Sequence, residues 1–279
     1  MEKHNKVRWK KGLDITPEIL IESDNFHISE RNLLGRFFAS RLYGILPDRK
    51  FCIEKDIDYD YVYIQKLACL AITSDGHLLN VHNDMPIKLS LDGAAGIELY
   101  VVLTVDPYTP TTEYNFVLKK TGETIKNGIP LFKICKNERH WEIDENYIPP
   151  VVVLYAVDEL KRQYAEMKEK LEQIIEKLPE NAAVYLQTML LKLELDNYSM
   201  RESPEELVLL LKKICWTLKL FIKTSKKIDE LPEVQRFMNE QYNHNEIWKI
   251  LQLGVESLVE IDQQIEKEEV VEEEYEMKI

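Results

Sequence analysis

The chain has 279 residues, of which 45% are hydrophobic and 30% charged, with only nine glycines. This composition is typical of a globular chain long enough for two domains, and it excludes a disordered protein. Its 49 acidic and 36 basic residues give a formal net charge of −13, which argues against nucleic acid or an anionic membrane as a partner because both would be repelled.

The first residues, MEKHNKVRWKK, are basic and do not lead into an apolar run. A secretory signal needs such a run, and a membrane-spanning helix needs about 20 apolar residues, which no segment of the chain offers. We therefore expect a cytoplasmic protein that does not insert into a membrane.

The segment WKKGLDITP follows directly and contains the most distinctive residues of the N-terminus: Trp9, Gly12, Leu13, Ile15 and Pro17. Leu13 and Ile15 alternate with polar residues as in an edge strand, so we expect a strap that closes a sheet edge or pairs with a neighbour's edge. An exposed tryptophan favours a binding interface. The alternative is that Trp9 folds back over the core of its own domain.

Residues 50–147 contain short runs rich in β-branched and aromatic residues, separated by turn residues. The clearest runs are 61–73, 77–81, 97–105, 113–120 and 129–135. Because no helical pattern lies between them, we predict an antiparallel β-sandwich or barrel.

A junction follows at Ile148-Pro149-Pro150, since two adjacent prolines continue neither a helix nor a strand ladder. The period then becomes helical, with apolar residues spaced alternately by four and three. These residues are Leu160, Tyr164, Met167, Leu171, Ile174 and Leu178. Such a seam is typical of a coiled coil or helix bundle. The period does not tell whether the seam packs within its own subunit or against two sister helices.

Three more helices are predicted. One covers 182–196, and one begins after Ser203, which serves as N-cap before Pro204. The last covers 245–267 and precedes a glutamate-rich end. The fold class is therefore α+β, with a β-sandwich domain and strap at 1–150, a helical neck or bundle at 151–267, and an acidic flexible tail at 268–279 that is either a solvated end or a docking segment.

No short signature of catalysis or cofactor binding is present: GxGxxG, GxxxxGK[ST] and GxSxG are all missing. Asp56, Asp58 and Asp60 alternate, but an EF-hand loop would need glycine and glutamate where Tyr61 and Leu67 stand. We expect no metal, no cofactor and no enzyme activity.

The four cysteines are widely spaced and lie among apolar residues: Cys52, Cys69, Cys135 and Cys215. No CxxC pair is present, and a reducing cytosol does not maintain disulfides. We expect all four to be small buried hydrophobic side chains.

The chain resembles TssK, the baseplate protein family of type VI secretion systems. The resemblance rests on Trp9, Gly12, Leu13, Ile15 and Pro17, on the β-rich region around ACLAITSDGHLL, and on the step from 148 to 150 into the helices. It implies a homotrimer whose β-sandwich shoulder binds the wedge proteins TssF and TssG and whose helical neck holds three subunits together. The chain departs from the family pattern in two places. Glu18-Ile19-Leu20 stands where the family usually has Gln-His-Phe, and the chain end leaves no room for a full C-terminal head. We therefore expect a short form of the family with a different membrane anchor.

Three hypotheses about function remain after this reading. The first is a non-catalytic structural adaptor that docks through the N-terminal segment and trimerises through 158–178, so that charge substitutions at Leu171 and Ile174 should release monomers. The second is a phage-tail-like receptor-binding or adhesin module, which would bind a glycan. The third is an enzyme whose catalytic groups come together only in the fold.

Overall fold

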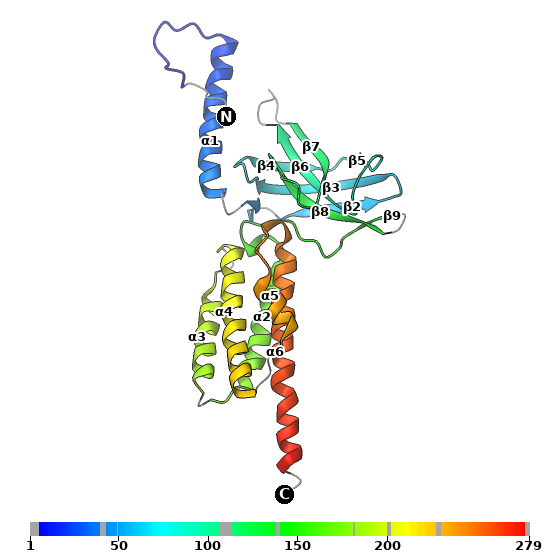
Figure 1. Ribbon diagram of the computed structural model, residues 1–279. Coiled ribbons are helices and arrows are strands. Elements are labelled where there is room, and N and C mark those ends of the chain that lie inside the picture. The colour runs from blue at the N-terminus through cyan, green and yellow to red at the C-terminus, as the bar shows by residue number, and fades with distance from the viewer. Residues whose placement is uncertain are drawn as a thin grey trace. The chain divides into compact units, whose positions relative to one another are not determined.

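The computed structural model (Figure 1) describes residues 6–39, 43–48, 50–106, 113–137, 140–180, 182–199, 202–226 and 230–276. The chain divides into two compact units, one of β-strands preceded by a helix and one of helices. The first unit extends to Glu145 and includes Pro149–Val152, whereas the second comprises Asn146–Ile148 and the chain from Val153. The predicted α+β fold class is confirmed. The predicted domain boundary at residue 150 falls where short segments of the two units alternate along the chain, and it stays a prediction.

The first unit begins with an extended segment and helix α1 (Pro17–Ala39). Thr16 precedes the helix, its hydroxyl accepts a hydrogen bond from the backbone N–H of Ile19 at 3.5 Å, and Pro17 occupies the first helical position. The expected edge strand over residues 13–16 is wrong, because these residues form no strand and lead directly into the helix. The sequence pattern predicted no helix in this part of the chain.

Five strands form the first sheet: β1 (Gly44–Ile45), β2 (Cys52–Ile57), β3 (Tyr61–Ile72), β4 (Leu78–Asn83) and β5 (Ile87–Ser90). The long strand β3 pairs antiparallel with each of the others. The second sheet has the order β7-β6-β8-β9, also antiparallel, with β6 (Glu98–Asp106), β7 (Glu113–Lys120), β8 (Gly128–Asn137) and β9 (His140–Ile143). The five predicted runs correspond to β3, β4, β6, β7 and β8.

Side chains from both sheets pack against each other and make this unit a sandwich. On β3, Val62 and Ile64 alternate with more exposed side chains and are completely buried, and the alternation resumes after an interruption at the fully buried Leu67. Two polar contacts also join the sheets. The Tyr114 hydroxyl of β7 lies 3.3 Å from the backbone nitrogen of Asn80 in β4, and Lys55 Nζ of β2 lies 5.3 Å from the ring centre of Phe132 in β8.

The second unit is a helix bundle of α2 (Asp158–Glu176), α3 (Ala183–Asn197), α4 (Pro204–Phe221), α5 (Pro232–Asn239) and α6 (Ile247–Glu276). Short 3-10 helices cover Leu154–Ala156 and His244–Glu246, and a π-helical turn, Ile222–Lys226, follows α4. Figure 1 shows α2, α3, α4 and α6 side by side.

The predicted start of α4 is confirmed, because the Ser203 hydroxyl accepts a hydrogen bond from the backbone N–H of Glu205 at 3.2 Å. Helix α5 lies where we expected only a connection. Helix α6 begins near the predicted position and continues to Glu276, past the predicted end at 267. Glutamate is a good helix former, which accounts for the continuation. The flexibility of the acidic tail stays a prediction.

Candidate functional site

The polar residues of the described chain offer no metal centre: no group of three or more His, Cys, Asp or Glu side chains within it is placed to hold an ion. Asp58, one of the three alternating aspartates, instead accepts hydrogen bonds from the backbone N–H groups of Asp60 and Tyr61. Among the described helices, none is both long enough and apolar enough to cross a bilayer.

The expectation that all four cysteines are buried is confirmed for two of them and is wrong for the other two. None of the four forms a disulfide; Cys69 and Cys215 are buried, whereas Cys52 and Cys135 are only half-buried. Burial raises the pKa of the Cys69 thiol and of the Cys215 thiol to about 12. Both thiols are therefore protonated and weakly nucleophilic at neutral pH.

The six residues proposed as a trimer contact all lie inside the subunit. Leu160, Met167, Leu171 and Ile174 have no exposed surface, and Tyr164 and Leu178 are 5% and 4% exposed. Helix α2, which carries all of them except Leu178, packs against α6 and α3 of the same chain. The spacing predicted the helix and its apolar stripe correctly, but we no longer assign the trimer contact to these side chains, because a fully packed side chain leaves no surface for a second subunit.

The N-terminal candidates lie on the surface of the first unit. Trp9 and Ile15 are 53% and 66% exposed, and Leu13 is 38% exposed. Gly12 has a φ of +89°, a value that favours glycine, and it allows the turn in which the Leu13 N–H bonds the Lys10 carbonyl at 3.1 Å. The segment thus presents an aromatic and two aliphatic side chains to solvent, as expected of a docking segment, while its binding role stays a prediction.

An exposed apolar surface of the helical unit was not found from the sequence. It consists of leucines spaced by four and three on α3 and of apolar residues at matching spacing on the neighbouring α4. We call it the α3–α4 face, and its residues are Leu186, Leu190, Leu193, Leu209, Trp216 and Leu220, each 45–64% exposed. Both rows have the spacing of a coiled-coil seam, and this spacing was the signal available in the sequence.

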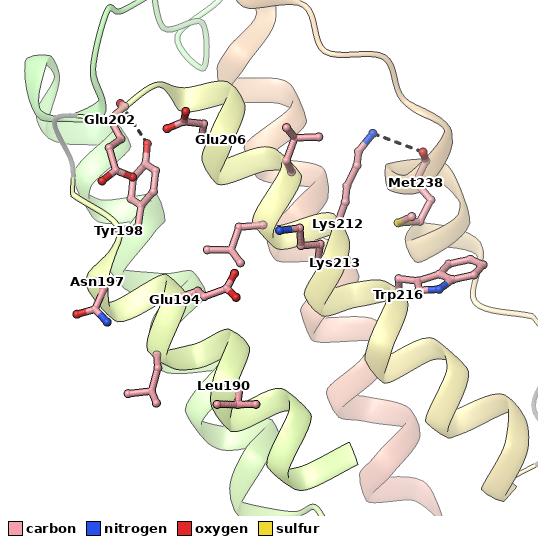
Figure 2. A pocket seen from close by; sticks show the side chains of 13 residues that line it. Leu190, Glu194, Asn197, Tyr198, Glu202, Glu206, Lys212, Lys213, Trp216 and Met238 are labelled. Carbon is pink, nitrogen blue, oxygen red and sulfur yellow. Dashed lines mark hydrogen bonds between the residues drawn. The ribbon is translucent and has the colours of Figure 1, made fainter. Parts of the chain in front are cut away.

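A groove with a volume of about 1050 Å³ runs along the same face (Figure 2). Leu190 and Leu193 of α3 and Leu209 and Trp216 of α4 line it, together with Met238 of α5. Carboxylates stand at one end of the groove, as Figure 2 shows for Glu202 and Glu206 near Tyr198. An apolar groove with a polar end has the composition of a protein interface.

Two hydrogen-bonded side chains fix the walls of this groove. Lys212 Nζ donates to the backbone carbonyls of Glu240 at 2.6 Å and Met238 at 3.4 Å, at the end of α5. Burial lowers the pKa of Lys212. The Tyr198 hydroxyl donates to the Ser203 carbonyl at 3.0 Å, and burial raises the pKa of Tyr198. The groove is therefore preformed.

Comparison with known proteins agrees with the resemblance seen in the sequence. The family model described as "Bacterial Type VI secretion, VC_A0110, EvfL, ImpJ, VasE" matches residues 109–215. No curated protein sequence matches the chain.

Several solved structures share its fold. A chain from the cryo-electron microscopy structure of the type VI secretion system TssK–TssF–TssG baseplate subcomplex superposes with a TM-score of 0.63 at 14% identity, covering 94% of this chain and 99% of the other. A crystal structure of TssK gives 0.61 at 11% identity, with 94% and 70% covered. A chain of the type VI secretion baseplate complex gives 0.55 at 13% identity, with 92% and 100% covered. The fold of this chain is therefore TssK-like.

Proposed function

Starting from this TssK-like fold, we propose that the chain is a non-catalytic structural subunit of a type VI secretion baseplate. Three copies form a homotrimer in the cytoplasm, bind the wedge proteins TssF and TssG, and link them towards a membrane-anchoring component. The observation that carries the proposal is the similarity over 94% of this chain to a chain of the TssK–TssF–TssG subcomplex.

The α3–α4 face is the surface that we assign to trimerisation, in place of the buried seam of α2. Two adjacent helices that both expose apolar residues at coiled-coil spacing leave a groove suited to a helix from another subunit. Clusters of exposed apolar side chains on this scale are typical of interaction sites, whereas single exposed leucines need no explanation.

The free energy available from this face is large enough to matter. Complete burial of a leucine-sized side chain contributes about 1.5–3 kcal/mol, and these six are roughly half exposed in the subunit. Covering all six thus contributes on the order of 5–9 kcal/mol per subunit. Association costs about 4–15 kcal/mol, so the face supports a trimer when further contacts add to it.

The N-terminal segment is the surface that we assign to the wedge proteins. Trp9, Leu13 and Ile15 lie on one short exposed stretch, and Leu20 and Ile21 at the start of α1 are 47% and 60% exposed. Tryptophan is among the side chains that contribute most of the binding energy in protein interfaces, and the aliphatic side chains around it exclude water.

Co-expression with the TssF and TssG proteins of the same organism tests this assignment. The wild-type chain is expected to co-purify with both. A Trp9→Ala, Ile15→Ala variant should lose at least about tenfold in affinity while its circular dichroism spectrum stays unchanged, because both side chains are exposed.

The matched control is Leu78→Ala, which truncates a side chain of β4 that is 47% exposed. It should bind as the wild type does. Failure of the wild-type chain to co-purify would contradict the baseplate role, and full binding by the double variant would contradict the assigned contact.

A further inference from the structure

A second pocket lies in the β-sandwich unit, where the turn between β2 and β3 meets the turn after β5 and the strands β8 and β9. Its volume of about 470 Å³ falls within the range of roughly 300–1,000 Å³ found for small-molecule sites. Tyr59, Asp60, Asp92, Lys136 and Trp141 are among its lining residues. The pocket is separate from the N-terminal segment and from the α3–α4 face.

Hydrogen bonds fix the backbone that forms this pocket. The Asp58 carboxylate accepts bonds from the N–H of Asp60 at 2.9 Å, from the N–H of Tyr61 at 2.7 Å and from the Tyr63 hydroxyl at 2.7 Å. The bond from Tyr63 is the main cause of the lowered pKa of Asp58. The Leu91 N–H donates to the Asp60 carbonyl at 2.7 Å and joins the two turns. The pocket is therefore formed before a ligand arrives.

The two carboxylates that line the pocket are not used by the fold. Within the described part of the chain, the carboxylates of Asp60 and Asp92 have no hydrogen-bond or ion-pair partner. Lys136 Nζ lies 5.5 Å from the ring centre of Trp141, and Lys88 Nζ lies 3.4 Å from that of Tyr61. Lys88 stands outside the lining, so the pocket itself carries both signs of charge as two carboxylates and one ammonium group.

Aromatic surface stands beside these groups. Tyr59 is 76% exposed, and its ring meets the His140 ring edge-on, with centroids 5.7 Å apart and planes at 89°. This contact orients the tyrosine ring and leaves most of its surface accessible. Trp141 is only 7% exposed and contributes to the wall.

We propose that this pocket binds a neutral saccharide. Sugars present pairs of hydroxyl groups, which donate to carboxylates and accept from ammonium groups, and an apolar C–H face, which packs on an aromatic ring. The unused carboxylates of Asp60 and Asp92, the ammonium group of Lys136 and the exposed ring of Tyr59 supply these partners together. The proposal does not depend on the baseplate role.

Saturation-transfer NMR with glucose, galactose, mannose and N-acetylglucosamine, followed by a glycan array, tests the proposal on the full chain. At least one neutral sugar should show saturable binding. Asp60→Asn, Asp92→Asn and Tyr59→Ala should each weaken it at least about tenfold. Asp48→Asn, a change at an exposed aspartate outside the pocket, should leave the affinity unchanged.

Circular dichroism of each variant separates loss of binding from loss of folding. No saturable binding by any of the sugars would overturn the proposal, as would binding that all three pocket substitutions leave intact. Tighter binding of cationic glucosamine than of N-acetylglucosamine would overturn the neutral class, because it would show that the two carboxylates dominate.

Discussion

The substitution Leu171→Ala separates a seam inside the subunit from a seam between subunits. Leu171 has no exposed surface in the bundle. The change removes three carbon atoms worth about 0.8 kcal/mol each, and the cavity left behind adds to the loss. We expect the free energy of unfolding to fall by about 2.5–5 kcal/mol.

Urea denaturation followed by circular dichroism measures this loss. The matched control is Leu190→Ala on the α3–α4 face, where a side chain that is 63% exposed should change the stability of the isolated subunit by only about 0.5 kcal/mol. The charge substitution Leu171→Glu should unfold the bundle, because an unpaired carboxylate cannot be buried there. A folded monomer with full helical content from Leu171→Glu would refute the reasoning, since only a seam between subunits gives that result.

Three further predictions concern other parts of the chain. In Gly35→Ala, the new Cβ would clash with the carbonyl oxygen of Gly76, so α1 should shift from the β3–β4 turn and be cleaved faster in limited proteolysis. An unchanged cleavage rate would count against this contact. Lys212→Met should lower the free energy of unfolding by about 1–3 kcal/mol in urea, because two carbonyls at the end of α5 lose their donor; a smaller loss would mean that water replaces the lysine. Hydrogen bonds from two lysines lower the pKa of Asp196, so its contribution, at most about 1 kcal/mol, should be present at neutral pH and lost as the pH falls below about 4. Thermal unfolding of Asp196→Asn should therefore differ from that of the wild type at pH 7 and not near about pH 2.

The β-sandwich was predictable because its strands follow local rules. The run 113–120 matches β7 residue for residue, and the run 61–73 ends one residue past β3. Both are rich in β-branched and aromatic residues and end at turn residues. The shortest strands, such as β1 with two residues, carry too little pattern to be recognised.

Helix α1 was not predicted because its apolar residues do not form one buried stripe. Leu20, Ile21, Leu33 and Leu34 are all exposed, and Ser23 is one of its few buried side chains. A helix whose apolar residues face solvent lacks the period that identifies a helix from sequence. The N-terminal candidates before it are exposed, as the sequence predicted, but they form a turn and not the predicted edge strand.

In the bundle, the sequence predicted which residues share a face but not what covers that face. The period of α2 is equally consistent with packing against α6 of the same chain and with packing against another subunit. The apolar rows on α3 and α4 have this period too, and only the fold shows that no other helix of the described chain covers them. Both surfaces have the same spacing, so only the three-dimensional contacts distinguish them.

The most direct test of trimerisation through the α3–α4 face is the molar mass in solution by light scattering after size exclusion. The chain has a mass of 32.9 kDa, so three copies give 3 × 32.9, or about 99 kDa. The wild-type protein and the control Leu78→Glu should show the trimer mass, and a Leu190→Glu, Trp216→Glu variant should show a folded subunit of 32.9 kDa. A wild-type monomer at high protein concentration, or a double variant that keeps the trimer mass, would contradict the assignment.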